Sequence, residues 1–309
     1  MEFFLGVDGG QSGTTAIIGN ELGRILGRGE GGPCNHASEA EGRAKLERAV
    51  GESVGAACQQ AGLEYATVSF RSACFGMSGG PDDKESILAG LLRTNRLVVT
   101  HDAATALAGA TGAGQGIVLI AGTGSIAYGR NAAGRTARAG GWGHIFGDEA
   151  GAFDIARQAT RAALRMEEGW GPQTALRHSL LAVTGARNAN QALHCFYSPE
   201  WPRSRVATLA TLVGAAAEEG DAVALQILDR AAQELAFLAA AVRGQLWTAG
   251  ELVEVAYVGG VFQEPRLLER FRLLTEFEEG NRCHAPNHGP AEGALLEAYR
   301  SEGLNPEVP

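Results

Sequence analysis

The sequence predicts an α/β protein built from two similar halves, and three observations carry this prediction. Apolar runs of strand length alternate with helical patterns along the first half of the chain. A strand, a turn rich in glycine and threonine, and a second strand open the chain, and the same arrangement returns at residues 117–130. The length of 309 residues suits roughly two domains.

In the first half, residues 3–8 and 15–18 are expected to form a β-hairpin with glycines at its tip. Apolar residues at helical spacing predict a helix over residues 41–62, and Gly62 suits its C-cap. The other expected elements are strands at 68–76 and 97–100 and helices at 84–92 and 103–110. A glycine-rich stretch at residues 112–116 separates the halves.

The second half begins with a wholly apolar strand at residues 117–121, which is expected to pair with a strand at 126–130. Further along, the chain becomes rich in alanine, the residue that favours helix most strongly. The expected helices cover residues 149–166, 174–183, 203–219, 221–247 and 290–300, with a late strand at 253–258.

Charge and composition argue against several classes of protein. Lys and Arg number 26 against 35 Asp and Glu, which gives a formal net charge of −9. No stretch of the sequence concentrates Lys and Arg, so no nucleic-acid partner is expected. The five cysteines are odd in number and form no Cys-x-x-Cys pair, which argues against a disulfide framework or a zinc site. No run suits a signal peptide or a membrane span, so we expect a cytoplasmic protein with no membrane partner.

The first hairpin turn, from Asp8 to Thr15, combines an acidic residue with glycines and threonines. Glycines let a backbone approach an oxyanion closely, and amides and hydroxyls can then donate to it. Asp8, at the end of its strand, could hold Mg²⁺ through water. The turn matches neither the P-loop nor the Rossmann signature, and an ordinary hairpin turn stays open as the alternative.

A second loop, Gly122-Thr123-Gly124-Ser125, follows the apolar strand of the second half. Its small side chains leave the amides free to face a phosphate, although an ordinary turn can have the same composition. Two such loops, one opening each half, predict a nucleotide enzyme with its site in the cleft between the halves.

Asp102 stands between an expected strand and an expected helix. An aspartate in this place can cap the N-terminus of the helix. It can also be the general base that takes a proton from a hydroxyl as the hydroxyl attacks a γ-phosphoryl group. Because this reaction needs positioning and charge neutralisation above all, one base, two phosphate loops and a metal suffice.

Residues 140–149 form the most distinctive run of the sequence, because glycines and aromatic residues dominate its first eight positions. Trp142 offers a flat apolar face to a sugar ring, and Asp148 can accept hydrogen bonds from sugar hydroxyls. Asp148 also precedes an expected helix, so a capping role is its alternative. His144 has no nearby cysteine or second histidine and is interpreted as structural.

Taken together and in this order, these segments resemble the N-acetylglucosamine kinase branch of the BadF/BadG/BcrA/BcrD-type ATPase family, within the actin-like ATPase and sugar-kinase superfamily. The resemblance covers nearly the whole chain. Its most specific feature is the joining of Gly-Thr-Gly-Ser to Gly-Gly-Trp-Gly-His and Gly-Asp-Glu at the spacing of residues 122–125, 140–144 and 147–149.

The resemblance implies two ribonuclease-H-like lobes, at residues 1–116 and 117–289, with the last helix (290–301) packing back on the N-terminal lobe. It implies an enzyme, an ATP- and Mg²⁺-dependent kinase that phosphorylates the 6-hydroxyl of N-acetylglucosamine or a closely related amino sugar. It also implies a homodimer. Which amino sugar is used stays open among N-acetylglucosamine, glucosamine, N-acetylmuramic acid and N-acetylmannosamine.

The family's roles carry over to positions that match its motifs. Asp102 would be the base and Asp8 would face Mg²⁺, whereas Gln11 and Ser12 receive no role. The residues expected around the sugar are Asn35, Ser78, Asp102, Thr123, Gly141, Trp142 and Asp148. Those expected around ATP are Gly9, Gly10, Thr14, Gly122, Thr123, Gly124 and Ser125 for the phosphates, and Gly214, Ala215, Gly259 and Gly260 for adenine.

Two other functions share this fold. An activator ATPase of a CoA-ester dehydratase or reductase would hold an iron–sulfur cluster by cysteines, but no cysteine adjoins the second phosphate loop. A non-catalytic sugar sensor would have no need of Asp102. We therefore expect the kinase.

Overall fold

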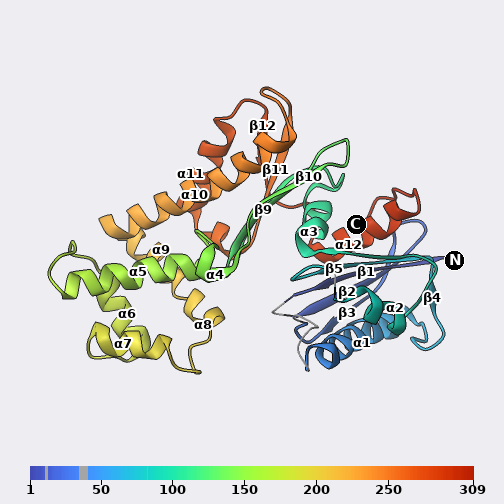
Figure 1. Cartoon of the computed structure of the whole chain (residues 1–309), viewed down its shortest axis with the longest axis horizontal. Helices are drawn as coiled ribbons and strands as arrows, with labels where there is room; N and C mark the ends of the chain where they lie inside the picture. Colours follow the sequence, from blue (N-terminus) through green and yellow to red (C-terminus); the bar gives the residue numbers. More distant parts are fainter. Residues whose placement is uncertain (11–12, 35–40, 82) are drawn as a thin grey trace. The chain divides into compact units, whose positions relative to one another are not determined.

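Figure 1 shows the computed structural model, which describes residues 1–10, 13–34, 41–81 and 83–309. The described chain divides into two compact units. The first comprises Met1–Val118 and Ala285–Pro309, and the second comprises Leu119–His284. Each unit contains one five-stranded sheet with helices packed on it.

The sheet of the first unit has the strand order β3-β2-β1-β5-β7. Its strands are β1 (Phe3–Gly9), β2 (Thr14–Asn20), β3 (Ile25–Gly31), β5 (Ser72–Met77) and β7 (Leu97–His101). The first three are antiparallel to their neighbours in sequence, whereas β5 is parallel to β1 and β7 is parallel to β5. The predicted hairpin at the start of the chain is therefore confirmed.

Helices cover both faces of this sheet. Helix α1 (Gly42–Ala61) packs against the face of the sheet to which Leu5 points. Helix α12 (Pro290–Ser301) packs against the face to which Phe4 points. Successive residues of a strand point to opposite faces, so these two helices lie on opposite sides. Helix α3 (Asp102–Thr111) packs against α12. The unit also contains α2 (Glu85–Leu91) and the paired short strands β4 (Ser69–Phe70) and β6 (Arg93–Thr94).

The C-cap predicted for α1 is confirmed. Gly62 has a φ of 69°, which places it in the left-handed region that glycine adopts without strain. The next amide, that of Leu63, donates to the carbonyl of Cys58 at 2.9 Å. These contacts satisfy carbonyls that the last turn of a helix would otherwise leave unpaired.

Strand β3 was not predicted, because its glycines suggest a turn. A Cβ added at Gly27, Gly29 or Gly31 would lie within 2.1–2.3 Å of a backbone carbonyl oxygen of α1. These alternate positions face the helix, so the absence of side chains lets α1 lie directly on the strand. Here glycine marks close packing of backbone on backbone.

The sheet of the second unit has the order β10-β9-β8-β11-β12. Its strands are β8 (Gly116–Ala121), β9 (Ser125–Arg130), β10 (Thr136–Gly140), β11 (Val253–Val258) and β12 (Asn281–His284). The order repeats that of the first sheet, in which three consecutive strands are neighbours and two later strands lie beyond the first. This is the order of a ribonuclease-H-like lobe, so the expected α/β fold class with two such lobes is confirmed.

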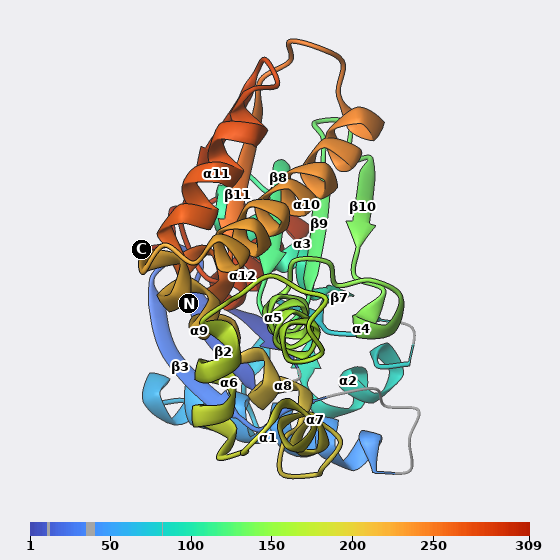
Figure 2. The ribbon, with the colours of Figure 1, turned by 90° about the vertical axis from the view of Figure 1, so that its left-hand side faces the viewer.

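Most of the second unit outside the sheet is helical. The helices are α4 (Gly143–Phe146), α5 (Ala152–Glu167), α6 (Leu176–Thr184), α7 (Ala189–Phe196), α8 (Arg203–Ala207), α9 (Ala210–Glu218), α10 (Ala222–Leu246) and α11 (Pro265–Glu276), with a 3₁₀ turn η1 (Gly260–Gln263). Figure 2 looks nearly along α5, with α6, α7 and α8 on one side of it. Small and aliphatic residues of α5 to α7, together with Val206 and Leu209, form a core of their own.

Several expected boundaries were wrong. The helix expected at 203–219 is two helices, α8 and α9, because residues 208–209 leave the helical ladder. The strand expected at 68–76 is interrupted at Arg71, whose amide donates to Phe3 O at 2.8 Å. Strands β10 and β12 and helices α7 and α11 were not predicted. No helix in the described ranges is both long and apolar enough to cross a bilayer.

Candidate functional site

Two acidic residues meet at one edge of the first sheet. Asp8 lies near the carboxyl end of β1, and Asp102 begins α3 immediately after β7. Strand β5 separates β1 from β7, and its Gly76 pairs with Asp8 on one side and with Thr100 on the other. Because the carboxyl ends of parallel strands meet at one edge, the topology brings both aspartates there.

Gly76 is what allows α3 to approach this edge. A Cβ at Gly76 would lie 2.0 Å from Thr105 Oγ1, so no other residue fits without displacing α3. Asp102 itself accepts a hydrogen bond from the amide of Ala103 through Oδ1, at 2.8 Å. The N-cap position of the helix belongs to His101, so Asp102 lies inside the first turn. Its second carboxylate oxygen has no hydrogen-bond partner among the described residues.

A third carboxylate, Glu292, was not predicted. It lies in the first turn of α12, the helix that crosses β1 at Gly6, where an added Cβ would lie 2.2 Å from Leu295 N. Oε1 of Glu292 accepts from Arg28 Nη1 at 2.8 Å. Oε2 is buried and has no hydrogen-bond partner among the described residues. A charged residue within an apolar helix pattern is the signal that could have identified it.

The negative charges of Asp102 and Glu292 repel the carboxylate of Asp8. Burial, followed by the negative charges of Asp102 and Glu292, raises the pKa of Asp8 to about 7 from 3.8. A divalent cation would relieve this repulsion, so the residues present fit Mg²⁺. Within the described ranges, no three His, Cys, Asp or Glu side chains are close enough to hold a metal alone. This fits Mg²⁺, which usually takes one or two carboxylates together with water and phosphate oxygens.

The raised pKa of Asp8 predicts a pH-dependent cost in stability. The folded protein keeps the Asp8 proton up to about pH 7, whereas the unfolded chain releases it near pH 3.8. Stability therefore falls as pH rises through this window, by at most about 1.4 kcal/mol per pH unit. In metal-free protein, Asp8→Asn should unfold at higher urea than wild type, with a gap that widens from pH 5 to 7. Parallel curves for the two proteins would contradict this assignment, and Asp229→Asn, at an exposed position, is the control.

The first hairpin loop is held by its own backbone. The amide of Gly10 donates to Gly13 O at 2.9 Å, and the amide of Ser78 donates to Gly9 O at 2.9 Å. The structure thus brings Ser78 beside the loop. Thr14 is fully buried, and its hydroxyl donates to Gly32 O at 2.9 Å, so its side chain holds the hairpin together. Gln11, Ser12 and Asn35 lie outside the described residues.

The second loop and the expected adenine segments come together within the second unit. Gly122 N donates to Gly124 O at 3.0 Å, which makes the loop a tight turn. Gly259 has a φ of 114°, and a Cβ there would lie 2.3 Å from Ala121 O, at the end of β8. A Cβ at Gly214 would lie 2.2 Å from Glu264 Oε2, just after η1. Ala215, next to Gly214, is exposed, as are Gly259 and Gly260.

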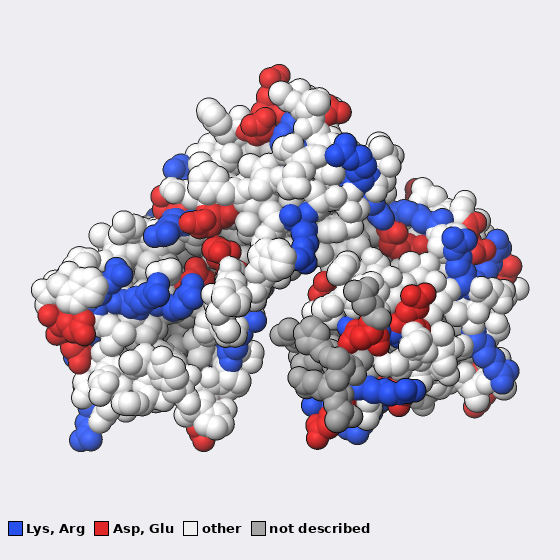
Figure 3. All heavy atoms as spheres, in the orientation of Figure 1, with Lys and Arg blue, Asp and Glu red and all other residues white. Residues whose placement is uncertain are grey.

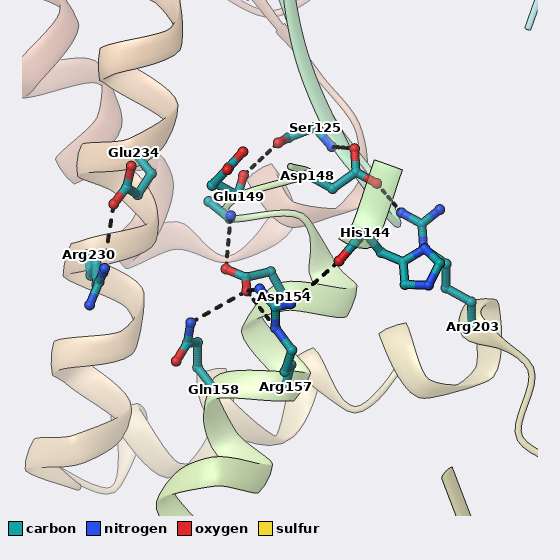
Figure 4. Close-up of polar contacts among 11 residues, drawn as sticks. Ser125, His144, Asp148, Glu149, Asp154, Arg157, Gln158, Arg203, Arg230 and Glu234 are labelled. Atoms are coloured by element: carbon teal, nitrogen blue, oxygen red, sulfur yellow. Dashed lines mark hydrogen bonds and ion pairs between the residues drawn. The ribbon is translucent and has the colours of Figure 1, made fainter. Parts of the chain in front are cut away.

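Asp148 is buried and anchors the segment that follows the glycine-aromatic run. Oδ1 of its carboxylate accepts from the amide of Ser125 at 3.4 Å, and Oδ2 forms an ion pair with Arg203 (Figure 4). Both Asp148 and Ala150 have positive φ, of 61° and 60°, a strained conformation for residues other than glycine. Helix α5 has Gly151 as its N-cap, so the capping interpretation of Asp148 is wrong.

Several hydrogen bonds hold this strained segment against the second loop. Ser125 Oγ donates to Glu149 O at 2.5 Å, and Phe153 N donates to Thr123 O at 3.1 Å. Asp154 accepts from the amide of Ala150 at 3.2 Å and pairs with Arg157 (Figure 4). Strained backbone that is held from several sides is typical of functional sites.

Trp142 lies close to the second loop and is exposed. Its exposed fraction is 63%, and Arg138 lies over its ring at 4.5 Å from the centroid. The amide of the preceding Gly141 donates to Ser125 O at 2.9 Å. The structure thus brings Gly141 and Asp148 to Ser125, with Trp142 directly after Gly141 in the chain. Arg203, 55 residues from Asp148 in sequence, was not predicted, because no motif marks it.

Comparisons with known proteins show which family the chain belongs to. The chain matches the model of the BadF/BadG/BcrA/BcrD ATPase family over residues 5–298. It is 33% identical, over 88% of its length and 90% of the relative, to an N-acetylmuramic acid/N-acetylglucosamine kinase of Clostridium acetobutylicum. It is 28% identical to an N-acetyl-D-glucosamine kinase of Dictyostelium discoideum, with coverage of 97% and 99%.

A solved structure resembles the fold as a whole. It comes from Chromobacterium violaceum and carries the provisional name N-acetylglucosamine kinase. The TM-score is 0.79 at 28% identity, with 96% of this chain and 98% of that chain covered.

Proposed function

Because the chain belongs to the BadF/BadG/BcrA/BcrD ATPase family, we propose that it is an ATP-dependent kinase that phosphorylates the 6-hydroxyl of N-acetylglucosamine or a closely related amino sugar. The observation that carries this proposal is the meeting of Asp8 and Asp102 at one edge of the first sheet. The relatives named as kinases of such sugars support the choice of substrate.

In this mechanism Asp102 takes the proton of the sugar 6-hydroxyl through its available carboxylate oxygen. The hydroxyl oxygen attacks the γ-phosphorus, the bond from this phosphorus to the β–γ bridging oxygen breaks, and ADP leaves. The hydrogen bond from Ala103 fixes the other oxygen of Asp102, so that the base is oriented before the substrate arrives.

Mg²⁺, when bound, would neutralise charge on the transferring phosphates. Asp8 would hold it through water, in agreement with the repulsion of Asp8 by Asp102 and Glu292. The backbone of Gly9 and Gly10 and the loop of residues 122–125 would bind phosphate oxygens through amides. Thr14 would support the first loop from inside the hairpin.

The remaining assignments rest on positions that match the family's motifs. Gly214, Ala215, Gly259 and Gly260 would flank adenine. Trp142 would stack on the sugar ring, and Asp148 would accept from sugar hydroxyls. The residues proposed to complete the sugar pocket are Asn35, Ser78, Thr123 and Gly141. That the protein is a homodimer and that it is cytoplasmic stay predictions. Light scattering can check the homodimer.

The experiment is a coupled assay of ADP release with Mg-ATP and a panel of sugars. The panel holds N-acetylglucosamine, glucosamine, N-acetylmuramic acid, N-acetylmannosamine and glucose. We expect the fastest turnover on an N-acetylated amino sugar. Slow ATP hydrolysis that no sugar accelerates would contradict the proposal; iron in the purified protein would then favour the activator ATPase, and sugar binding without turnover would favour the sensor.

The position of Arg203 leads us to predict how the enzyme distinguishes N-acetylmuramic acid from N-acetylglucosamine. N-Acetylmuramic acid differs from N-acetylglucosamine by a lactyl ether that carries a carboxylate, and the guanidinium of Arg203 lies beside the proposed sugar ligand Asp148. Its Nε is buried without a partner among the described residues. If this cation binds the lactyl carboxylate, Arg203→Gln should lower the ratio of kcat/KM for N-acetylmuramic acid over N-acetylglucosamine about tenfold or more.

The ratio of the two kcat/KM values separates a loss of specificity from a displacement of Asp148. Loss of the contact between Arg203 and Asp148 would lower kcat/KM for both sugars and leave their ratio unchanged. Arg203→Lys keeps the charge and should keep most of the preference. An unchanged ratio in Arg203→Gln would show that Arg203 only positions Asp148.

A further inference from the structure

A groove in the second unit is lined by none of the residues assigned to ATP or sugar, although Glu149 and Ala150 of its lining directly follow the proposed sugar ligand Asp148. It runs between α5 and α10 and has a volume of about 360 Å³. Four arginines line it: Arg157, Arg161 and Arg165 from α5, and Arg230 from α10. Figure 3 shows a row of Lys and Arg side chains over α5, at the left of the view, with acidic side chains beside it.

The arginines of α5 share one face of the helix. They recur at every fourth residue, a spacing that stacks side chains above one another along a helix. Like charges at this spacing repel and weaken the helix. The chain carries a net charge of −9, so a cationic row of this kind runs against its overall composition. Because this arrangement lowers the stability of the helix, we infer that it serves a purpose other than folding, such as binding an anion.

Acidic residues in the groove neutralise only part of this charge. Asp154 pairs with Arg157, and Glu234 lies 3.7 Å from Arg230 (Figure 4). Glu149 is the third carboxylate of the lining. The side chain of Arg161, in contrast, makes no hydrogen bond or ion pair with any residue in the described ranges, and Arg161 is exposed. Arg165 lies over the ring of Trp170, 4.8 Å from its centroid.

The rest of the lining combines amide groups with an apolar wall. Gln158 and Gln226 contribute side-chain amides, which can donate hydrogen bonds. Ile155, Val223 and Ile227 contribute aliphatic surface. Of the sixteen lining residues, seven are apolar and nine are charged or carry an amide, so the groove suits a ligand that combines a charged group with an organic part. A bare inorganic ion would leave the apolar wall unused.

We propose that this groove binds a small organic phosphate monoester, with Arg161 and Arg165 on its phosphate. The planar guanidinium group matches two phosphate oxygens at once and forms charge-assisted hydrogen bonds to them. The organic part of the ligand lies against the aliphatic side chains of α5 and α10. The site stands independently of the kinase reaction, because no residue proposed for catalysis lines it.

Glycerol 3-phosphate is the probe, titrated by calorimetry into protein saturated with Mg²⁺ and a non-hydrolysable ATP analogue. The analogue occupies the phosphate loops, so that binding reports on the groove. We expect one molecule bound per chain, with an affinity that falls as salt is added. Inorganic phosphate should bind more weakly, because it leaves the apolar wall uncovered.

Arg161→Gln is the decisive variant, since this side chain makes no hydrogen bond or ion pair within the described part of the chain, whereas Arg157 holds Asp154 and through it Ala150. We expect the affinity to fall about tenfold or more. Arg187→Gln removes an exposed arginine of the same unit outside the groove and should bind as wild type does. Absence of binding to wild type, equal affinity in Arg161→Gln, or equally tight binding of inorganic phosphate would each overturn the proposal.

Discussion

Asp102→Asn is expected to lower kcat by about 10²–10⁴-fold, the usual contribution of a positioned general base. Asparagine has the size of aspartate and can still accept from the amide of Ala103, so the first turn of α3 should stay folded. It cannot take the proton of the 6-hydroxyl. Turnover is measured by ADP release, and sugar affinity is measured separately by calorimetry, where we expect little change.

Asp229→Asn is the matched control for this variant. Asp229 pairs with Arg270 at 2.8 Å on the surface of the second unit and belongs to no segment assigned to catalysis or binding. Its removal should leave kcat within about twofold, because exposed ion pairs contribute little. If Asp102→Asn kept turnover close to that of wild type, the base would have to be another group.

Gly124→Ala is expected to lower kcat/KM by about 10²-fold or more and to cost about 1–3 kcal/mol of stability. The added Cβ would lie 2.4 Å from Asp148 Oδ2. Asp148 cannot move away freely, because Arg203 and the amide of Ser125 hold its carboxylate. The methyl group must therefore displace either the second loop or the proposed sugar ligand.

Gly122→Ala tests this explanation in the same loop. A Cβ at Gly122 meets no atom within 4 Å, and its φ lies outside the left-handed region. The free energy of unfolding of the Gly122→Ala variant should stay within about 0.5 kcal/mol of that of wild type. Urea denaturation of both variants gives the comparison. Equal losses of stability at the two glycines would show that the contact with Asp148 is not the cause.

The sequence alone predicted those elements that are specified by residues close together in the chain. Gly62 ends α1 as its position in the apolar pattern indicates, and the apolar run at 117–121 is β8. The hairpin that opens each half likewise appears in both sheets, as β1-β2 and β8-β9. Strand β3 could not be predicted in this way, because its glycines reflect contact with α1, which lies elsewhere in the sequence.

The candidate site shows the same limit. Each of Asp8, Asp102 and Asp148 ends or follows a local motif, so the sequence indicates it. Glu292 and Arg203 belong to no motif, and only the folded chain relates them to those aspartates. The raised pKa of Asp8 likewise depends on burial and on two distant charges. Such electrostatic effects arise from tertiary structure, and no local pattern carries them.

The most direct test of the proposed reaction is the structure of its product. N-Acetylglucosamine, Mg-ATP and the enzyme are incubated, and the product is examined by phosphorus and proton nuclear magnetic resonance. We expect one ADP for each sugar phosphate, with the phosphorus coupled to the two protons on carbon 6, and no ADP above background with 6-deoxy-N-acetylglucosamine. Phosphate on another sugar atom, or ADP release without a phosphorylated sugar, would contradict the assignment of Asp102 as the base of a 6-kinase.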